Sequence, residues 1–122
     1  MKKILLGFGY AFKGIKYAYT TQVNFKIHSV AAVLTITTGV LLNISVNEWL
    51  WIALAIMLVV VAEMLNTAIE ILTDLASPEW SEKAGRVKDL SAGAVVIVAA
   101  FALVSGLVIF LPKLYLLLTH AA

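Results

Sequence analysis

The feature that most constrains this chain is an apolar run from Trp49 to about Leu75 that carries acidic residues in its second half. At a rise of about 1.5 Å per residue this run would be about 40 Å long, whereas the hydrocarbon core of a bilayer is about 30 Å thick. The run therefore predicts a membrane-spanning helix whose last turns project from the membrane. We expect Glu63 to lie slightly below the boundary, and Glu70 and Asp74 to lie near or beyond it.

The three acids share one side of the predicted helix. At about 100° per residue, Glu63, Glu70 and Asp74 fall within roughly 40° of one another, with Asn66 and Thr67 beside them. An ionised carboxylate is costly in lipid, so these acids are candidate functional residues. Oxygen ligands alone suit a hard cation such as Mg²⁺. The alternative is that the acids only pair with Lys or Arg and hold a helix bundle together.

The composition places the whole chain in a membrane. Of its 122 residues, 62% are hydrophobic and only 13% are charged, with a mean hydropathy of +1.00. We expect one membrane-embedded, all-α domain over residues 1–122. The absence of cysteine excludes disulfides and thiolate metal sites, and the net charge of +2 gives no indication of nucleic-acid binding.

Three membrane spans follow from the hydropathy pattern, at about residues 27–44, 49–75 and 90–111. Residues 1–26 predict an amphipathic helix on the membrane surface, with lysines facing outward and aromatic rings inward. A signal peptide at the N-terminus is the alternative, but the segment lacks an Ala-x-Ala-like cleavage site.

Two prolines mark the ends of spans. Ser77 and Pro78 should end the second span, and they could begin a short new helix. Pro112, followed by Lys113, should end the third span.

The basic residues predict the orientation of the spans. Eight of the nine Lys and Arg residues lie before residue 27 or between residues 83 and 88. With three spans these two segments lie on the same side, which the positive-inside rule makes the cytoplasmic side. We therefore expect a multi-pass protein of the cytoplasmic membrane whose acids face the compartment that holds ATP.

Motifs for several common chemistries are missing. The chain has no P-loop, no kinase-type glycine-rich signature, no His/Cys metal cluster and no nucleophilic triad. It does have acids at a membrane boundary, and Arg86, Lys88 and Asp89 at the start of the third span. Phosphoryl transfer needs a divalent cation, a cation on the phosphates and a carboxylate that takes a hydroxyl proton. For Arg86 and Lys88 alone, a basic anchor at the membrane interface is the alternative.

Two segments also carry a resemblance to a known family. They are Ala62-Glu63-Met64-Leu65-Asn66-Thr67-Ala68-Ile69-Glu70 and Gly85-Arg86-Val87-Lys88-Asp89-Leu90-Ser91-Ala92-Gly93-Ala94-Val95. Gly9-Tyr10, Lys13-Gly14 and Asn24-Phe25-Lys26-Ile27-His28 add to it. Together they resemble the small prokaryotic integral-membrane diacylglycerol kinase family, which includes the undecaprenol kinases of Gram-positive bacteria. The resemblance covers nearly the whole chain.

The resemblance implies a homotrimer in which each subunit has three spans and a surface helix. It implies transfer of the γ-phosphate of ATP to a lipid alcohol, with Mg²⁺ as cofactor. By matching position, Glu63 would be the general base with Asn66 beside it, and Glu70 would bind the metal. The positions that would bind the nucleotide are Lys88, Asp89, Tyr10 and Lys13.

One position departs from the family pattern. The family usually has a Glu, serving as a second metal ligand, where this chain has Gln22. A Gln side chain can coordinate a metal through its carbonyl oxygen but adds no negative charge. We expect Gln22 to lie at the metal site, and the number of metal ions bound there stays open.

Two questions stay open at this point. The acceptor is undecaprenol or diacylglycerol, and the stretch from Asn24 to His28 favours undecaprenol slightly. The competing function is a non-enzymatic membrane subunit whose intramembrane acids carry protons, but the third span has no ionisable group to continue such a path. We expect His28 to be an interface residue with a backbone partner, and His120 to be exposed.

Overall fold

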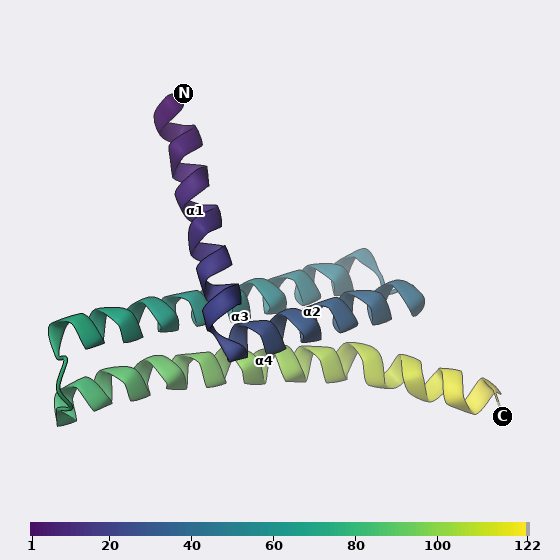
Figure 1. Cartoon of the computed structure of the whole chain (residues 1–122). Helices are drawn as coiled ribbons and strands as arrows, with labels where there is room; N and C mark the ends of the chain where they lie inside the picture. The colour runs from purple at the N-terminus through teal and green to yellow at the C-terminus, as the bar shows by residue number, and fades with distance from the viewer. Residues whose placement is uncertain (122) are drawn as a thin grey trace.

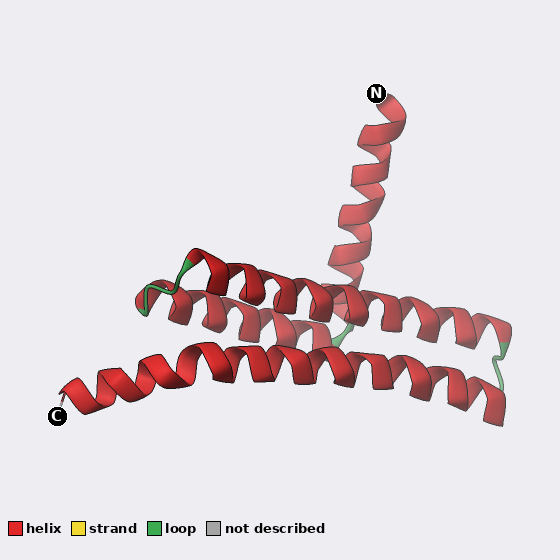
Figure 2. Cartoon of the chain, turned by 180° about the vertical axis from the view of Figure 1, so that it is seen from behind, coloured by secondary structure: helices red, strands yellow, loops and turns green. Residues whose placement is uncertain are grey.

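The structure, a computed structural model, describes residues 1–121 and shows four α-helices there (Figure 1). They are α1 (Lys2–Thr21), α2 (Val23–Leu41), α3 (Val46–Ala76) and α4 (Glu82–Ala121). Helices α2, α3 and α4 run side by side, and α1 stands across them, as the view from behind in Figure 2 also shows. The expected all-α fold is confirmed over the described residues.

Helices α1 and α2 are separated by one extended residue, Gln22, with φ −106° and ψ 114°. Just before it, the hydroxyls of Thr20 and Thr21 donate to backbone carbonyls one turn earlier. Such side-chain bonds compete with helix continuation. The predicted surface segment 1–26 is therefore divided, and its last residues, 23–26, belong to the first spanning helix.

Helices α2, α3 and α4 are each long and apolar enough to cross a membrane. Most of their large apolar side chains are exposed in the single chain, which suits contact with hydrocarbon rather than with water. The prediction of three spanning helices is confirmed. Helix α1 touches the bundle only near its end, where Ala18 is buried, and its position on a membrane surface stays a prediction.

Helix α2 begins near the middle of α3, not at its end (Figure 1). His28 of α2 lies 3.2 Å from Glu63 of α3, and the start of α2 lies about 8 Å further along α3 at the usual helical rise. Glu70 lies about 10 Å beyond Glu63 in the same direction. Helix α1 therefore leaves the bundle at about the level of Glu70, and residues 71–88 form a helical hairpin beyond that level.

The turn between α2 and α3 is short and fixed by its own side chains. Asn43 has a φ of 50°, and Ser45 and Glu48 form a capping box in which each side chain accepts from the other's backbone N–H. The carboxylate of Glu48 also lies 3.1 Å from Nζ of Lys113 on α4. A small apolar core of Ile44, Ile52 and Ile109 lies next to this turn and joins the same ends of α3 and α4.

Helix α4 differs from the sequence prediction at both ends. Ser81 is the capping residue, because its Oγ accepts from the N–H of Ala84 at 3.1 Å, whereas Ser77 and Pro78 start no helix. The prediction that Pro112 ends the third helix is wrong, since α4 continues through it. A proline removes one N–H donor and bends the axis, but an apolar helix in lipid regains its backbone hydrogen bonds on the far side. Figure 1 shows this last part of α4 curved.

Gly39 provides a test of the packing between α2 and the start of α3. A Cβ atom there would lie 2.7 Å from Cη2 of Trp49 and 3.1 Å from Cδ1 of Ile44. We expect Gly39→Ala to lower the free energy of unfolding by about 1–3 kcal/mol, because the added methyl group overpacks this contact. Thermal unfolding in detergent measures the change. Gly106→Ala is the control, since nothing lies within 4 Å of a Cβ there. Equal stability of the two variants would contradict the packing.

Candidate active site

Glu63 lies in the middle of α3 and is almost completely buried, with 3% of its surface exposed. Its Oε1 lies 3.2 Å from Nε2 of His28, but this contact is not a hydrogen bond, and Oε1 has no hydrogen-bond partner within the described residues. A buried polar atom without a partner is costly and calls for an explanation. The position offers a free acceptor to a proton donor that comes from outside the chain.

Asn66 lies one turn after Glu63 on the same side of α3. Its Nδ2 donates to Oε1 of Glu70 at 3.2 Å, while its own Oδ1 is buried without a partner in the described residues. Asn66 therefore orients Glu70 and adds a second free acceptor oxygen beside the one on Glu63. The two oxygens and the Glu70 carboxylate form a run of acceptors along one face of the helix.

The buried threonines of α3 do not use these acceptors. The hydroxyl of Thr67 donates to the backbone carbonyl of Glu63 at 2.9 Å, and that of Thr73 donates to the carbonyl of Ile69 at 2.7 Å. Each hydroxyl is satisfied within its own helix, which is common for Thr in membrane helices. The carboxylate of Glu63 and the amide oxygen of Asn66 are left for other partners.

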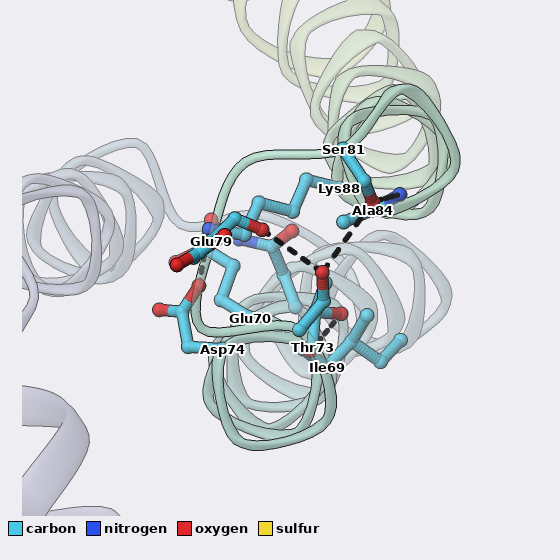
Figure 3. Close-up of polar contacts among 10 residues, drawn as sticks. Ile69, Glu70, Thr73, Asp74, Glu79, Ser81, Ala84 and Lys88 are labelled. Atoms are coloured by element: carbon cyan, nitrogen blue, oxygen red, sulfur yellow. Dashed lines mark hydrogen bonds and ion pairs between the residues drawn. The ribbon is translucent and has the colours of Figure 1, made fainter.

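Asp74 is paired, unlike the two acids below it. Its Oδ1 accepts from Nζ of Lys88 at 2.6 Å, and Figure 3 shows Lys88 reaching from α4 to α3, with Glu70 on the same side. The hydrogen bond to Asp74, together with the nearby charge of Glu70, raises the pKa of Lys88, which lies before the apolar span of α4. The view that these acids only hold helices together fits Asp74. It does not fit Glu63 and Glu70, neither of which forms an ion pair with Lys or Arg among the described residues.

An apolar cavity of about 410 Å³ runs along the bundle between α2, α3 and α4. Small side chains such as Ala31, Ala55 and Ala102 line it. His28 stands at one end, next to Glu63, and Leu114 stands at the other. Its lining suits a hydrocarbon chain or an apolar helix, and Glu63 itself is not among the lining residues.

The structure separates the remaining predicted site residues within one chain. Tyr10 and Lys13 lie on α1, which projects from the bundle, and the ammonium of Lys13 lies 5.6 Å from the centre of the Tyr10 ring. The amide of Gln22 donates to its neighbour Thr21 at 3.3 Å. Asp89 is exposed on α4, and as the neighbour of Lys88 it faces another direction.

His28 is the residue whose surroundings the sequence did not reveal. It was expected to have a backbone partner, but its side chain contacts Glu63. The signal that would have found it is the helix register. With α2 and α3 antiparallel across a four-residue turn from Leu42 to Ser45, residue 28 comes level with about residue 59, one helical turn before Glu63 on the same face of α3.

The donors present are compatible with Mg²⁺ but do not enclose it. No group of three or more His, Cys, Asp or Glu residues that could hold a metal is found among residues the structure describes. Mg²⁺ keeps several waters and is commonly bound by one or two carboxylates plus substrate phosphates. The part-buried carboxylate of Glu70, held by Asn66, could serve as one such ligand.

Comparison with known proteins gives a consistent picture. Residues 9–110 match the family described as prokaryotic diacylglycerol kinase. A diacylglycerol kinase of Synechocystis is 39% identical over 91% of this chain, which spans 64% of that longer relative. An undecaprenol kinase of Bacillus subtilis is 38% identical over 93% of both chains, and a diacylglycerol kinase of Escherichia coli is 30% identical over 84% of both.

The resemblance read from the two signature segments is thereby confirmed. The three spanning helices and the family agree on a multi-pass membrane protein. The chain belongs to the prokaryotic diacylglycerol kinase family of lipid kinases.

Proposed function

We propose that this chain transfers the γ-phosphate of ATP to a lipid alcohol at the cytoplasmic face of the membrane. The observation that carries the proposal is the buried Glu63, whose Oε1 has no hydrogen-bond partner in the described residues. In a helix that crosses lipid, a structural role would favour a paired or uncharged group at this position. A carboxylate in contact with His28, which lines the apolar cavity, suits a hydroxyl group on a hydrocarbon chain.

Glu63 is assigned as the general base. Its carboxylate takes the proton of the lipid hydroxyl while the hydroxyl oxygen attacks the γ-phosphorus, and the bond from that phosphorus to the bridging oxygen of ADP breaks. Asn66, one turn away, supports the site by donating from Nδ2 to Glu70 and so orients that carboxylate beside the proposed base. Burial of both groups excludes water, which would otherwise compete with the lipid for the phosphoryl group.

Glu70 and Gln22 are the proposed residues for Mg²⁺. When bound, the metal neutralises charge on the β- and γ-phosphates. Glu70 supplies an anionic oxygen that Asn66 holds in place. Gln22 lies at the junction of α1 and α2, which reaches about the level of Glu70 along the bundle, and it can add only a neutral carbonyl oxygen.

The nucleotide is proposed to contact Lys88, Asp89, Tyr10 and Lys13. Lys88 is charged and is shared with Asp74, so it can bind a phosphate only by leaving or sharing that contact. Tyr10 and Lys13 stand on α1, away from the hairpin that carries Lys88. We propose a homotrimer in which α1 of one subunit approaches the hairpin of another, so that the nucleotide site is completed between subunits.

The proposed orientation places the N-terminus and the loop between α3 and α4 in the cytoplasm. The clusters of Lys and Arg in both segments support it through the positive-inside rule. In that orientation Glu70 and Asp74 lie toward the cytoplasm, where ATP is.

Undecaprenol is the acceptor we favour over diacylglycerol. The similarity to an undecaprenol kinase extends over 93% of both chains, whereas the similarity to the Synechocystis diacylglycerol kinase covers 64% of that protein. The cavity has an apolar lining with small side chains along its length, which also suits one long hydrocarbon chain.

The first prediction concerns the base. Glu63→Gln should lower kcat by a factor of about 10²–10⁴, because the amide cannot accept the hydroxyl proton, while ATP binding changes little. Phosphorylated lipid measured with labelled ATP gives kcat, and nucleotide titration gives binding. Glu82→Gln changes an exposed carboxylate at the start of α4 and should leave kcat and ATP binding unchanged. A wild-type rate in Glu63→Gln would remove its assigned role.

The second prediction concerns the metal. Gln22→Glu should lower the Mg²⁺ concentration needed for half-maximal activity, because a second carboxylate adds negative charge near the cation. A magnesium titration at saturating ATP measures it. Asn24→Asp adds the same charge two residues away and serves as the control. If both variants respond equally, or if Gln22→Glu does not respond, position 22 does not reach the metal.

The third prediction concerns the acceptor. With undecaprenol and a diacylglycerol offered separately in the same mixed micelles, we expect the larger kcat/KM with undecaprenol. The assay follows each phosphorylated product by chromatography, and Glu63→Gln provides the blank for both. A preference for diacylglycerol would reverse the acceptor assignment and leave the lipid kinase assignment in place.

A further inference from the structure

We propose that His28 is a positioning residue for Glu63 that receives the proton which Glu63 takes from the acceptor and releases it to the surface. The inference rests on the proposed function, because it assigns His28 a role only if Glu63 acts as the base. It goes beyond that function in naming the exit path of the proton.

The contact itself carries the inference. Nε2 of His28 lies 3.2 Å from Oε1 of Glu63, which is within proton-transfer distance. Among the described residues, His28 is the ionisable residue that contacts this carboxylate. The Glu63 side chain is 4% exposed and that of His28 is 28% exposed. The imidazole is therefore the more accessible of the two groups in the single chain.

The geometry allows the imidazole of His28 to turn and accept a proton from Glu63. No hydrogen bond among the described residues reaches Oε1 of Glu63, so none fixes the His28 ring against it in one orientation. Rotation of a histidine ring about its second side-chain torsion is soft, so alignment with the carboxyl group needs little energy. A neutral ring with its proton on Nδ1 presents the Nε2 lone pair to a protonated Glu63.

The chemistry needs such an exit. After phosphoryl transfer Glu63 carries the hydroxyl proton and must lose it before the next turnover. In the proposed step the O–H bond of Glu63 breaks and an N–H bond forms at Nε2, which gives a carboxylate and an imidazolium. The imidazolium then gives a proton to water at its exposed edge. Histidine serves as a proton shuttle in proteins because its imidazole can both accept and release a proton.

No other ionisable group competes for this contact among the described residues. On α3 the neighbours of Glu63 toward the cavity are apolar, and α4 has no ionisable side chain between Asp89 and Lys113. On α2 the nearest is Lys26, which is exposed, and on α1 Lys13 and Lys16 are exposed. None of these three lysines forms an ion pair with Glu63.

The test compares His28→Ala, His28→Gln and His120→Ala in the full-length protein in micelles, with kcat, KM for ATP and thermal unfolding measured for each. We expect His28→Ala and His28→Gln to lose about tenfold or more in kcat while KM for ATP stays within about twofold, because neither side chain accepts a proton. His120→Ala should match the wild type. Added imidazole should restore part of the kcat of His28→Ala, and more above the pKa of imidazole than below it.

Other outcomes separate the inference from the proposed function. Wild-type rates in both His28 variants, with Glu63→Gln inactive, would overturn the role of His28 and leave Glu63 as the base. Full activity in His28→Gln with a slow His28→Ala that imidazole does not rescue would show a packing role and also overturn the inference. If His28→Ala fails to fold, His28→Gln decides alone. If Glu63→Gln is fully active, the proposed function itself fails.

Discussion

The arrangement depends on one costly feature, a carboxylate buried in a helix that crosses lipid. Removing an ionised carboxylate from water costs several kcal/mol unless partners compensate. In this chain Glu63 is almost completely buried, and the only charged or chargeable group that contacts it among the described residues is His28 of α2. The positions at which the other helices begin can be described relative to Glu63. Helix α2 begins, and α1 leaves the bundle, about one and a half to two turns beyond Glu63, and the apolar cavity is lined by its neighbour His28.

Depth along α3 explains why three acids on one stripe behave differently. Asp74 lies on the hairpin beyond the start of α2, where Lys88 can reach it, and the two form an exposed ion pair that contributes little stability. Glu70 lies at the intermediate level and accepts a hydrogen bond from Asn66. Glu63 lies deepest and has neither an amide donor nor a permanently charged partner. The three acids look equivalent on a helical wheel, but their partners differ. Asp74 forms an ion pair, whereas Glu63 has no permanently charged partner among the described residues.

Periodicity and hydropathy predicted what depends on a single helix. The long second span, the common face of Glu63 and Glu70, and the number of spans follow from the order of residues along one axis. Three local features were not predicted. Gln22 breaks a helix without glycine or proline, Ser81 caps α4 in place of Ser77, and Pro112 bends α4 without ending it. Each depends on which of several competing backbone hydrogen bonds forms, and sequence pattern ranks these poorly.

The site also required information that no single helix holds. The contact between His28 and Glu63 is set by the register of α2 against α3, and that register is set by the capping box at Ser45 and the close approach of Gly39 to Trp49. A turn longer by one residue would rotate the next helix by about 100° and move Glu63 away from His28. The far end of the bundle, which carries no proposed chemistry, thus determines the surroundings of the base.

The separation of groups within one chain has a physical consequence for assembly. Phosphoryl transfer requires the base, the metal ligand and the phosphate-binding cation to meet within a few ångströms. Glu63 and Glu70 are fixed on α3, but Tyr10 and Lys13 stand on a helix that extends away from them. Helices α2, α3 and α4 expose many large apolar side chains, and this surface leaves room for neighbouring subunits as well as for lipid. The proposed homotrimer would bring a second α1 to the open side of Glu70, while the covered side of Glu63 stays with its own α2. The acceptor side of the reaction would then belong to one subunit and the nucleotide side to two.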